Sequence, residues 1–168
     1  MAEALRDRLV PSLLDRLTDD DIGTKVETRD RRLMTVPQLR SSVLRDISCL
    51  FNVARLGVDH IFDDFPEVKR SVLNYGLPSL SGKCISGTDM KELEREFKQA
   101  IINFEPRLIP DSVIVKAQVN KKDLDLHNIV SFNIRAQLWA QPAPVELTLQ
   151  TDLDLENGQC KVTEGGRR

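Results

Sequence analysis

The chain has 168 residues, of which 24 are Lys or Arg and 26 are Asp or Glu, so its formal net charge at neutral pH is −2. This near balance argues against a surface built for nucleic acid or anionic lipid, and the length is typical of one domain that needs no metal or disulfide. No stretch approaches the roughly 20 apolar residues of a membrane span, and three widely spaced cysteines indicate reduced thiols in a cytosolic protein.

The first predicted element is a short helix in the sequence PSLLDRL. Pro11 suits a first helical turn, and three leucines form an apolar stripe, namely Leu13, Leu14 and Leu17. Helices below about 12 residues are marginal alone, so this helix needs a surface to lie on. That surface is either the chain's own domain or a partner, and the sequence leaves both open. Residues 22–34 are polar and charged and indicate a solvated linker.

A longer helix is predicted from Thr35, where the sequence fits a capping box in which Gln38 reaches back to the cap. An apolar stripe at steps of three and four residues places this helix in the core, and Gly57 is its expected end. The stripe consists of Leu39, Val43, Ile47, Leu50 and Ala54. Pro66 opens another short helix, and the sequence Tyr-Gly-Leu-Pro at 75–78 predicts a turn.

The last predicted helix starts at a second capping-box pattern, with Asp89 as its cap. Its apolar face consists of Met90, Leu93, Phe97, Ala100, Ile101 and Phe104. Pro106 stops the helix and favours an extended backbone for Glu105. A carboxylate there faces the negative end of the helix dipole, which is unfavourable unless a cation such as Arg107 answers it. Glu105 is therefore predicted to be a corner residue.

The last third of the chain changes from a period of 3.6 to a period of two, which predicts antiparallel strands with one buried face. The alternation covers residues 113–119, 130–138 and 145–155. Exposed strand edges invite pairing with another chain, and the segment with the most regular polar face, 145–155, is the expected docking edge. Asn157-Gly158 predicts a turn, and residues 161–168 are expected to form a flexible tail.

Together these elements predict an α+β domain with N-terminal helices packed on one face of a mainly antiparallel β-meander. The expected organisation is a short helix and linker at residues 1–34, the α+β domain at 35–160 and the tail at 161–168. The polar face of the sheet is left for solvent, and its edges for solvent or another chain.

The sequence carries no signature of catalysis or metal binding. His60 and His127 lie near no cysteine or carboxylate at metal-ligand spacing, and no nucleotide-binding or hydrolase motif occurs. Glu105 is the candidate general acid, because apolar residues flank it. However, the nearby guanidinium of Arg107 favours a charged carboxylate, whereas a general acid must hold its proton. We therefore favour an ion pair over glycoside chemistry and expect no catalytic residue, cofactor or metal.

Four motifs spread over the chain resemble one known family. They are NFEPRL, with Glu-Pro-Arg at the end of the last helix, and PSLLDRL, SSVLRDISCLFN and FPEVKRSVLNYGLPSLSG. The first resembles the sheath-initiating baseplate wedge proteins of contractile injection machines, and the others are similar to the TssE branch from bacterial type VI secretion. The resemblance covers about residues 11–155. Glu-Pro-Arg alone is a weak signal, and its combination with SVLNYGLP and LLDRL makes it specific.

This resemblance implies a structural part, not an enzyme, in a baseplate at the cytosolic face of the bacterial inner membrane. The implied partners are other wedge subunits, similar to TssF, TssG and TssK, and sheath proteins similar to TssB and TssC that begin to polymerise on its sheet. It further implies that Glu105, Pro106 and Arg107 take part in docking. We expect the leucine stripe of the first helix to contact a wedge partner as well.

Two alternative functions stay open at this point. One is a regulatory adaptor, because a small anti-adaptor of regulated proteolysis resembles this family's fold, although SVLNYGLP speaks against it. The other is a peptidoglycan hydrolase, against which Arg107 speaks. In every case we expect no nucleic-acid partner and no direct insertion into a membrane.

Overall fold

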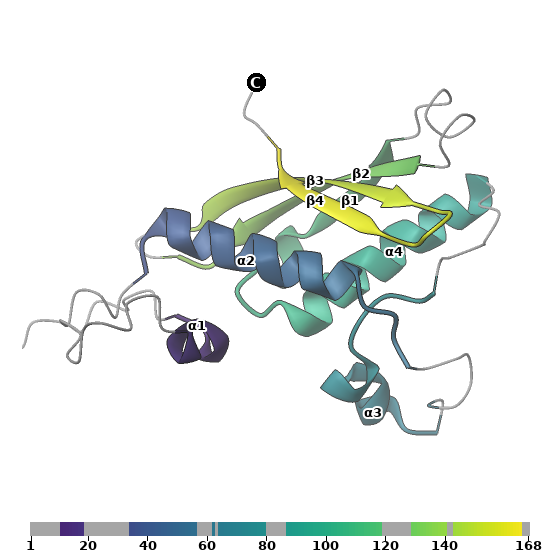
Figure 1. Ribbon diagram of the computed structural model, residues 1–168, viewed down its shortest axis with the longest axis horizontal. Helices are drawn as coiled ribbons and strands as arrows, with labels where there is room; N and C mark the ends of the chain where they lie inside the picture. The colour runs from purple at the N-terminus through teal and green to yellow at the C-terminus, as the bar shows by residue number, and fades with distance from the viewer. Residues whose placement is uncertain are drawn as a thin grey trace, which may run out of the picture.

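Two long helices lie against one face of a four-stranded antiparallel sheet in the computed structural model (Figure 1). The structure describes residues 11–18, 34–56, 62, 64–79, 87–118, 129–140 and 143–165, without the side chains of 87–89. The helices are α1 (Leu13–Leu17), α2 (Val36–Phe51), α3 (Pro66–Arg70) and α4 (Gly87–Phe104), with 3-10 turns at Val72–Asn74 and Pro110–Ser112. The strands are β1 (Ile114–Gln118), β2 (Ile129–Leu138), β3 (Val145–Asp154) and β4 (Cys160–Glu164).

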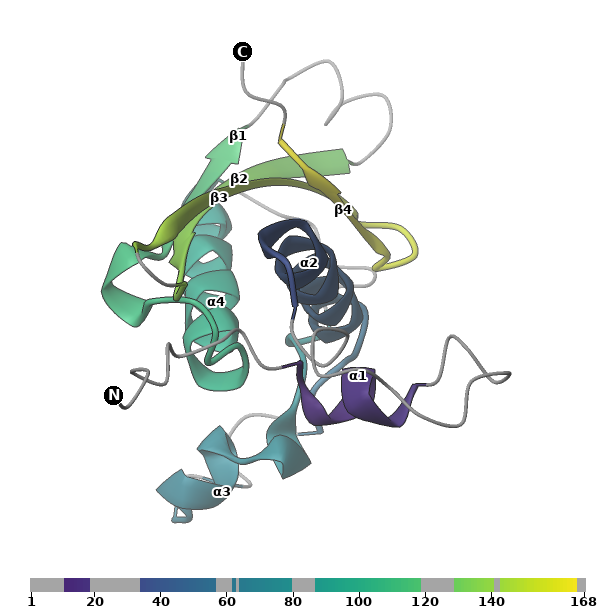
Figure 2. The same cartoon turned by 90° about the vertical axis from the view of Figure 1, so that its left-hand side faces the viewer.

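The sheet is a meander in the order β1-β2-β3-β4, and every neighbouring pair is antiparallel. Figure 2 shows α2 and α4 side by side beneath it, with α4 against β1 and α2 against β4. This arrangement confirms the predicted α+β class. No helix in the described part of the chain is long and apolar enough to cross a membrane.

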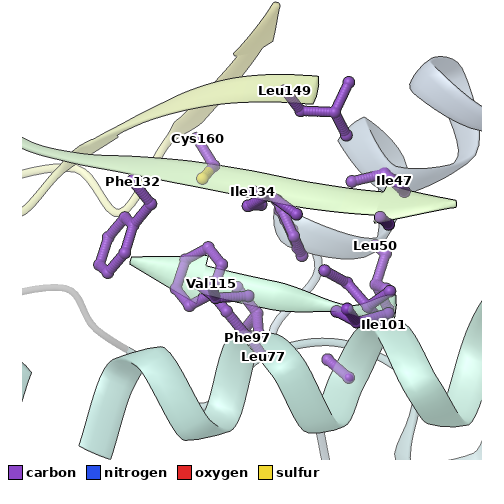
Figure 3. Packing of buried hydrophobic residues seen from close by; sticks show 14 of the residues in the cluster. Ile47, Leu50, Leu77, Phe97, Ile101, Val115, Phe132, Ile134, Leu149 and Cys160 are labelled. Atoms are coloured by element: carbon purple, nitrogen blue, oxygen red, sulfur yellow. The ribbon is translucent and has the colours of Figure 1, made fainter. Parts of the chain in front are cut away.

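The core lies between the sheet and these two helices, as period-two and period-3.6 patterns require. Phe97 of α4 is fully buried, with its ring 4.6 Å from that of Phe132 and 4.7 Å from that of Phe51. The predicted alternation in β2 and β3 is confirmed, because every second residue there is buried. Figure 3 shows these side chains meeting those of the helices between the two layers.

The prediction that residues 145–155 form a docking edge is wrong, because β3 is an interior strand. It pairs with β2 on one side and with β4 on the other. Residues 161–164, which we expected in a flexible tail, belong to β4, while residues 166–168 lie outside the described part. A tight turn makes this fourth strand possible: the Asp154 carboxylate accepts a hydrogen bond from the N–H of Glu156, and Gly158 has φ 74°.

Two helix boundaries differ from the predictions. α2 ends at Phe51, so Ala54 is not part of its apolar stripe but forms a parallel bridge with Leu77. The helix stops because Asn52 caps it and turns its side chain to the sheet. α4 begins at Gly87, which puts Asp89 inside the first turn and not at the cap. The expected stop at Gly57 and the linker before residue 34 lie outside the described residues.

Candidate functional site

The Glu-Pro-Arg corner joins the end of α4 to the sheet. The N–H of Glu105 still donates to the carbonyl of Ile101, which completes the last helical turn. Two residues later the carbonyl of Arg107 accepts a hydrogen bond from the N–H of Trp139, at the end of β2. Leu108 then forms a bridge with Leu138. The corner is therefore held at both ends by backbone hydrogen bonds, and its geometry is fixed by the fold.

Glu105 and Arg107 form an ion pair at this corner, in which the carboxylate is buried and the guanidinium is partly buried. Glu105 is only 3% exposed. Its Oε1 accepts hydrogen bonds from the backbone N–H and from Nε of Arg107, at 3.1 and 2.7 Å, and its Oε2 accepts one from Nη2. A carboxylate that is buried and satisfied in this way is part of the structure, and it is poorly placed to give a proton to a substrate. The geometry thus agrees with the ion-pair interpretation.

The same guanidinium extends the network to α2. Arg107 forms an ion pair with Asp46, and its Nη1 donates to the hydroxyl of Ser42 at 2.9 Å. Burial alone would lower the pKa of Arg107, but the hydrogen bonds and charges of Glu105 and Asp46 raise that pKa above its ordinary value. Arg107 thus stays charged and connects α4, the corner and α2.

Helix α1 is bonded to α2 through the carboxylate of Asp15. Asp15 accepts hydrogen bonds from Ser42, at 2.8 Å, and from Arg45, at 2.7 Å. Burial would raise the pKa of Asp15, but hydrogen bonds from Ser12, Ser42 and Arg45 outweigh it and hold that pKa well below its usual range. The three leucines are largely exposed, with exposed fractions of 71% for Leu13, 57% for Leu14 and 74% for Leu17.

A cavity of about 470 Å³ opens between α1 and the corner. Its charged side is formed by Glu105, Arg107 and Asp46. Its apolar side is formed by Leu14, Ile47, Leu50, Tyr75, Phe104 and Pro106. Tyr75 is held there by an edge-on contact with Phe104, with ring centres 5.2 Å apart. The structure thus brings all three motif residues and one of the three leucines together at one cavity.

Sequence reasoning missed three members of this site, namely Ser42, Asp46 and Asp15. Ser42 and Asp46 are four residues apart, so they share a face of α2 beside its apolar stripe. A polar pair at that spacing next to a buried stripe was the available signal. Arg107 bonds both side chains, but it lies 65 residues after Ser42 and 61 residues after Asp46. No local sequence pattern predicts a contact over such a distance.

Both edges of the sheet are partly closed by helix side chains. In β4 the carboxamide of Asn52 donates to the carbonyl of Cys160, at 2.8 Å, and accepts from its N–H, at 2.9 Å. In β1 the carboxylate of Glu94 accepts from the N–H of Ala117 at 2.8 Å. Backbone groups alternate in direction along an antiparallel edge, so the residues that still face outward in β4 are Val162 and Glu164.

Other candidate chemistry finds no support in the described residues. They contain no group of three or more His, Cys, Asp or Glu side chains that could hold a metal ion. His60, His127 and Cys84 lie outside the described part of the chain. Cys160 is buried in the core, and burial together with the nearby Asp152 raises the pKa of its thiol to about 12.

Most of the chain matches a known protein family. Residues 37–143, well over half of the chain and including the whole Glu-Pro-Arg corner, match the family model of the baseplate wedge protein gp25. Comparisons with curated proteins and with solved structures gave no significant match. The matched family is structural, and other baseplate subunits are the partners that it implies. The chain therefore belongs to the baseplate wedge family of gp25 and is a wedge component of a contractile tail-like machine.

Proposed function

We propose that this chain is the TssE-like subunit of a type VI secretion baseplate, which docks to wedge subunits and starts polymerisation of the contractile sheath. The family match supports the wedge role. The motifs FPEVKRSVLNYGLPSLSG and PSLLDRL support the type VI branch, because they are similar to TssE sequences. The proposed partners are TssF-, TssG- and TssK-like wedge subunits and TssB- and TssC-like sheath proteins, on the cytosolic side of the inner membrane.

The wedge contact is proposed at the cavity between α1 and the corner. Glu105, Pro106 and Arg107 shape its floor, and Leu13, Leu14 and Leu17 offer an apolar surface beside it. Exposed clusters of large apolar side chains are typical of binding surfaces. The observation that carries this proposal is that Asp15 bonds α1 to its own domain while the three leucines of α1 stay largely exposed.

Deleting residues 1–20 is expected to leave the domain stable while weakening wedge binding. The described contacts of α1 are hydrogen bonds and one ion pair whose Arg45 side chain is 42% exposed, and such pairs contribute about 0–1 kcal/mol. The free energy of unfolding, measured with urea, should therefore change by no more than about 1 kcal/mol. Co-purification with the wedge subunits encoded beside this chain should fall sharply. A large loss of stability would show that α1 belongs to the core.

The sheath contact is proposed at the free edge of β4. In β4 two outward-facing residues, Val162 and Glu164, are not covered by Asn52. In β1 one of the two outward-facing residues, Ala117, is already bonded by Glu94. The β4 edge thus offers more backbone groups to an added strand, and such pairing gives affinity with little dependence on side chains.

Proline at Val162 is expected to block sheath recruitment without unfolding the sheet. The N–H of residue 162 points away from β3, so its removal costs no hydrogen bond within the chain, and proline is tolerated on edge strands. Val162→Thr keeps both the N–H and the branched shape and is the matched control. Sheath and wedge pull-downs should be read separately, with folding checked by circular dichroism. Normal sheath recruitment by folded Val162→Pro would exclude strand addition at β4.

A further inference from the structure

A chain of hydrogen bonds connects the corner to α1 through one buried hydroxyl. Nη1 of Arg107 donates to Oγ of Ser42 at 2.9 Å, and the same Oγ donates to Oδ2 of Asp15 at 2.8 Å. Ser42 is only 5% exposed. A hydroxyl has one proton to donate, and here that proton goes to α1 while a lone pair accepts from the corner. The hydroxyl of Ser42 therefore connects the guanidinium of Arg107 to the carboxylate of Asp15.

The charged side chains around Ser42 also connect the corner to α1. Arg45 bonds both Asp15, at 2.7 Å, and Asp46, at 2.8 Å, and Asp46 in turn pairs with Arg107. Two arginines and two carboxylates thus alternate between the corner and α1. No leucine of α1 is buried, so we expect this network to provide much of what holds α1 on α2.

We infer that Glu105 and Arg107 are positioning residues, which hold α1 through Ser42 and Asp15 so that its leucines and the cavity form one docking surface. This inference rests on the proposed wedge contact and names how that contact is built. The occupant is an apolar segment of a neighbouring wedge subunit, since Leu14 and the aromatic and aliphatic residues opposite it line the cavity. α1 lies outside residues 37–143, which match the family model, whereas Ser42 and Arg107 lie inside them.

Direct contact between the Glu105 carboxylate and a partner does not fit the geometry. The carboxylate is 3% exposed, and both of its oxygens accept hydrogen bonds from Arg107. The guanidinium is also committed, because Nε, Nη1 and Nη2 donate to Glu105, Ser42 and Asp46. A partner meets Pro106, which is exposed, and the surface that α1 completes.

The first test measures the position of α1 directly. Ser42→Ala removes the connecting hydroxyl, and Ser41→Ala, at the exposed neighbouring position, is the matched control. Hydrogen exchange of the backbone amides of residues 12–18 is expected to accelerate on the order of fivefold in Ser42→Ala, the factor for one lost hydrogen bond, and to stay unchanged in Ser41→Ala. Unchanged exchange in Ser42→Ala would overturn the inference.

A second variant tests whether the change at α1 could result from damage to the corner itself. Asp15→Asn weakens the same connection from the α1 end, together with the capping box at Ser12 and the ion pair with Arg45, and leaves every Glu105–Arg107 contact intact. We expect an acceleration at residues 12–18 at least as large as in Ser42→Ala, with unchanged exchange at 105–109. Exchange that instead rises at 105–109 in both variants would show that α1 stabilises the corner, and not the reverse.

The third arm asks whether the corner acts through α1. Ser42→Ala is expected to weaken wedge binding about fivefold in the full chain, in line with the exchange, and to have no further effect in the chain that lacks residues 1–20. Equal losses in the two backgrounds would mean that Ser42 acts independently of α1, and the inference would fail. Absence of wedge binding in the unaltered chain would sink the proposed function alone, since the exchange experiment still decides the position of α1.

Discussion

Arg107→Ala is expected to lower the free energy of unfolding by about 3–5 kcal/mol, because it leaves the buried carboxylate of Glu105 without its cation. The sequence alone suggested otherwise. A corner position at a helix end is typical of surface residues, whose replacement usually changes stability by no more than about 0.5 kcal/mol. With Glu105 at 3% exposure that expectation no longer holds. Urea unfolding would measure this loss, and the dependence of the unfolding free energy on urea concentration should stay unchanged.

Two further variants separate burial from charge. Arg45→Ala is the matched control, since Arg45 also pairs with Asp46 but is 42% exposed, and its loss should cost no more than about 1 kcal/mol. The double change Glu105→Leu with Arg107→Met removes both charges and should recover most of the stability, as replacement of buried ion pairs often does. Wedge binding should be lost in Arg107→Ala and in the double variant alike. A loss below 1 kcal/mol in Arg107→Ala would mean that water reaches the carboxylate.

Gly76→Ala is expected to cost about 3 kcal/mol or more, which makes it the second large effect. Gly76 has φ 117°, a conformation that other residues rarely adopt, and an added Cβ would overlap the carbonyl of Val53. That carbonyl accepts the N–H of Leu77 and closes the bridge between Ala54 and Leu77. The substitution therefore breaks the contact that holds this turn against the end of α2.

The effect should reach the cavity through Tyr75, the residue before Gly76. Its ring packs edge-on against Phe104, and both line the cavity. We expect weaker wedge binding together with a lower thermal midpoint. Gly158→Ala is the control, because it also has positive φ, at 74°, but lies in the β3–β4 turn, and should cost only about 1–2 kcal/mol. Equal costs for the two glycines would show that the Val53 contact relaxes.

Local sequence patterns predicted the features that depend on residues close together in the chain. The alternation in β2 and β3 reports a sheet with one buried face, and the capping box at Thr35 is present as predicted. The ion pair of Glu105 and Arg107 was predictable because a proline fixes two nearby charges at a helix end. By contrast, β4 was missed: Lys161, Thr163 and Glu164 are exposed, and an edge strand that buries so little shows no pattern of its own.

Contacts across long sequence distances account for the other differences. The stripe of α2 continues to Ala54, but the helix stops at Phe51, because the side chain of Asn52 bonds Cys160, which is 108 residues away. The position of α1 likewise depends on Asp15 meeting Ser42 and Arg45 of another helix. Composition and periodicity contain no information on such pairs, and only the packed structure supplies it.

The carboxamide of Asn52 limits how firmly one copy of this chain can hold an added strand. With Cys160 occupied, Val162 and Glu164 together present four backbone groups along β4. At a net 0.5–1.5 kcal/mol for each hydrogen bond, the pairing yields about 2–6 kcal/mol, much of which association entropy consumes. A single edge therefore captures a strand only briefly. Lasting attachment requires several copies that present their edges together, so that release of one strand is reversed while its neighbours remain bound. Under the proposed strand addition, a lone copy of the subunit should therefore hold no sheath for long.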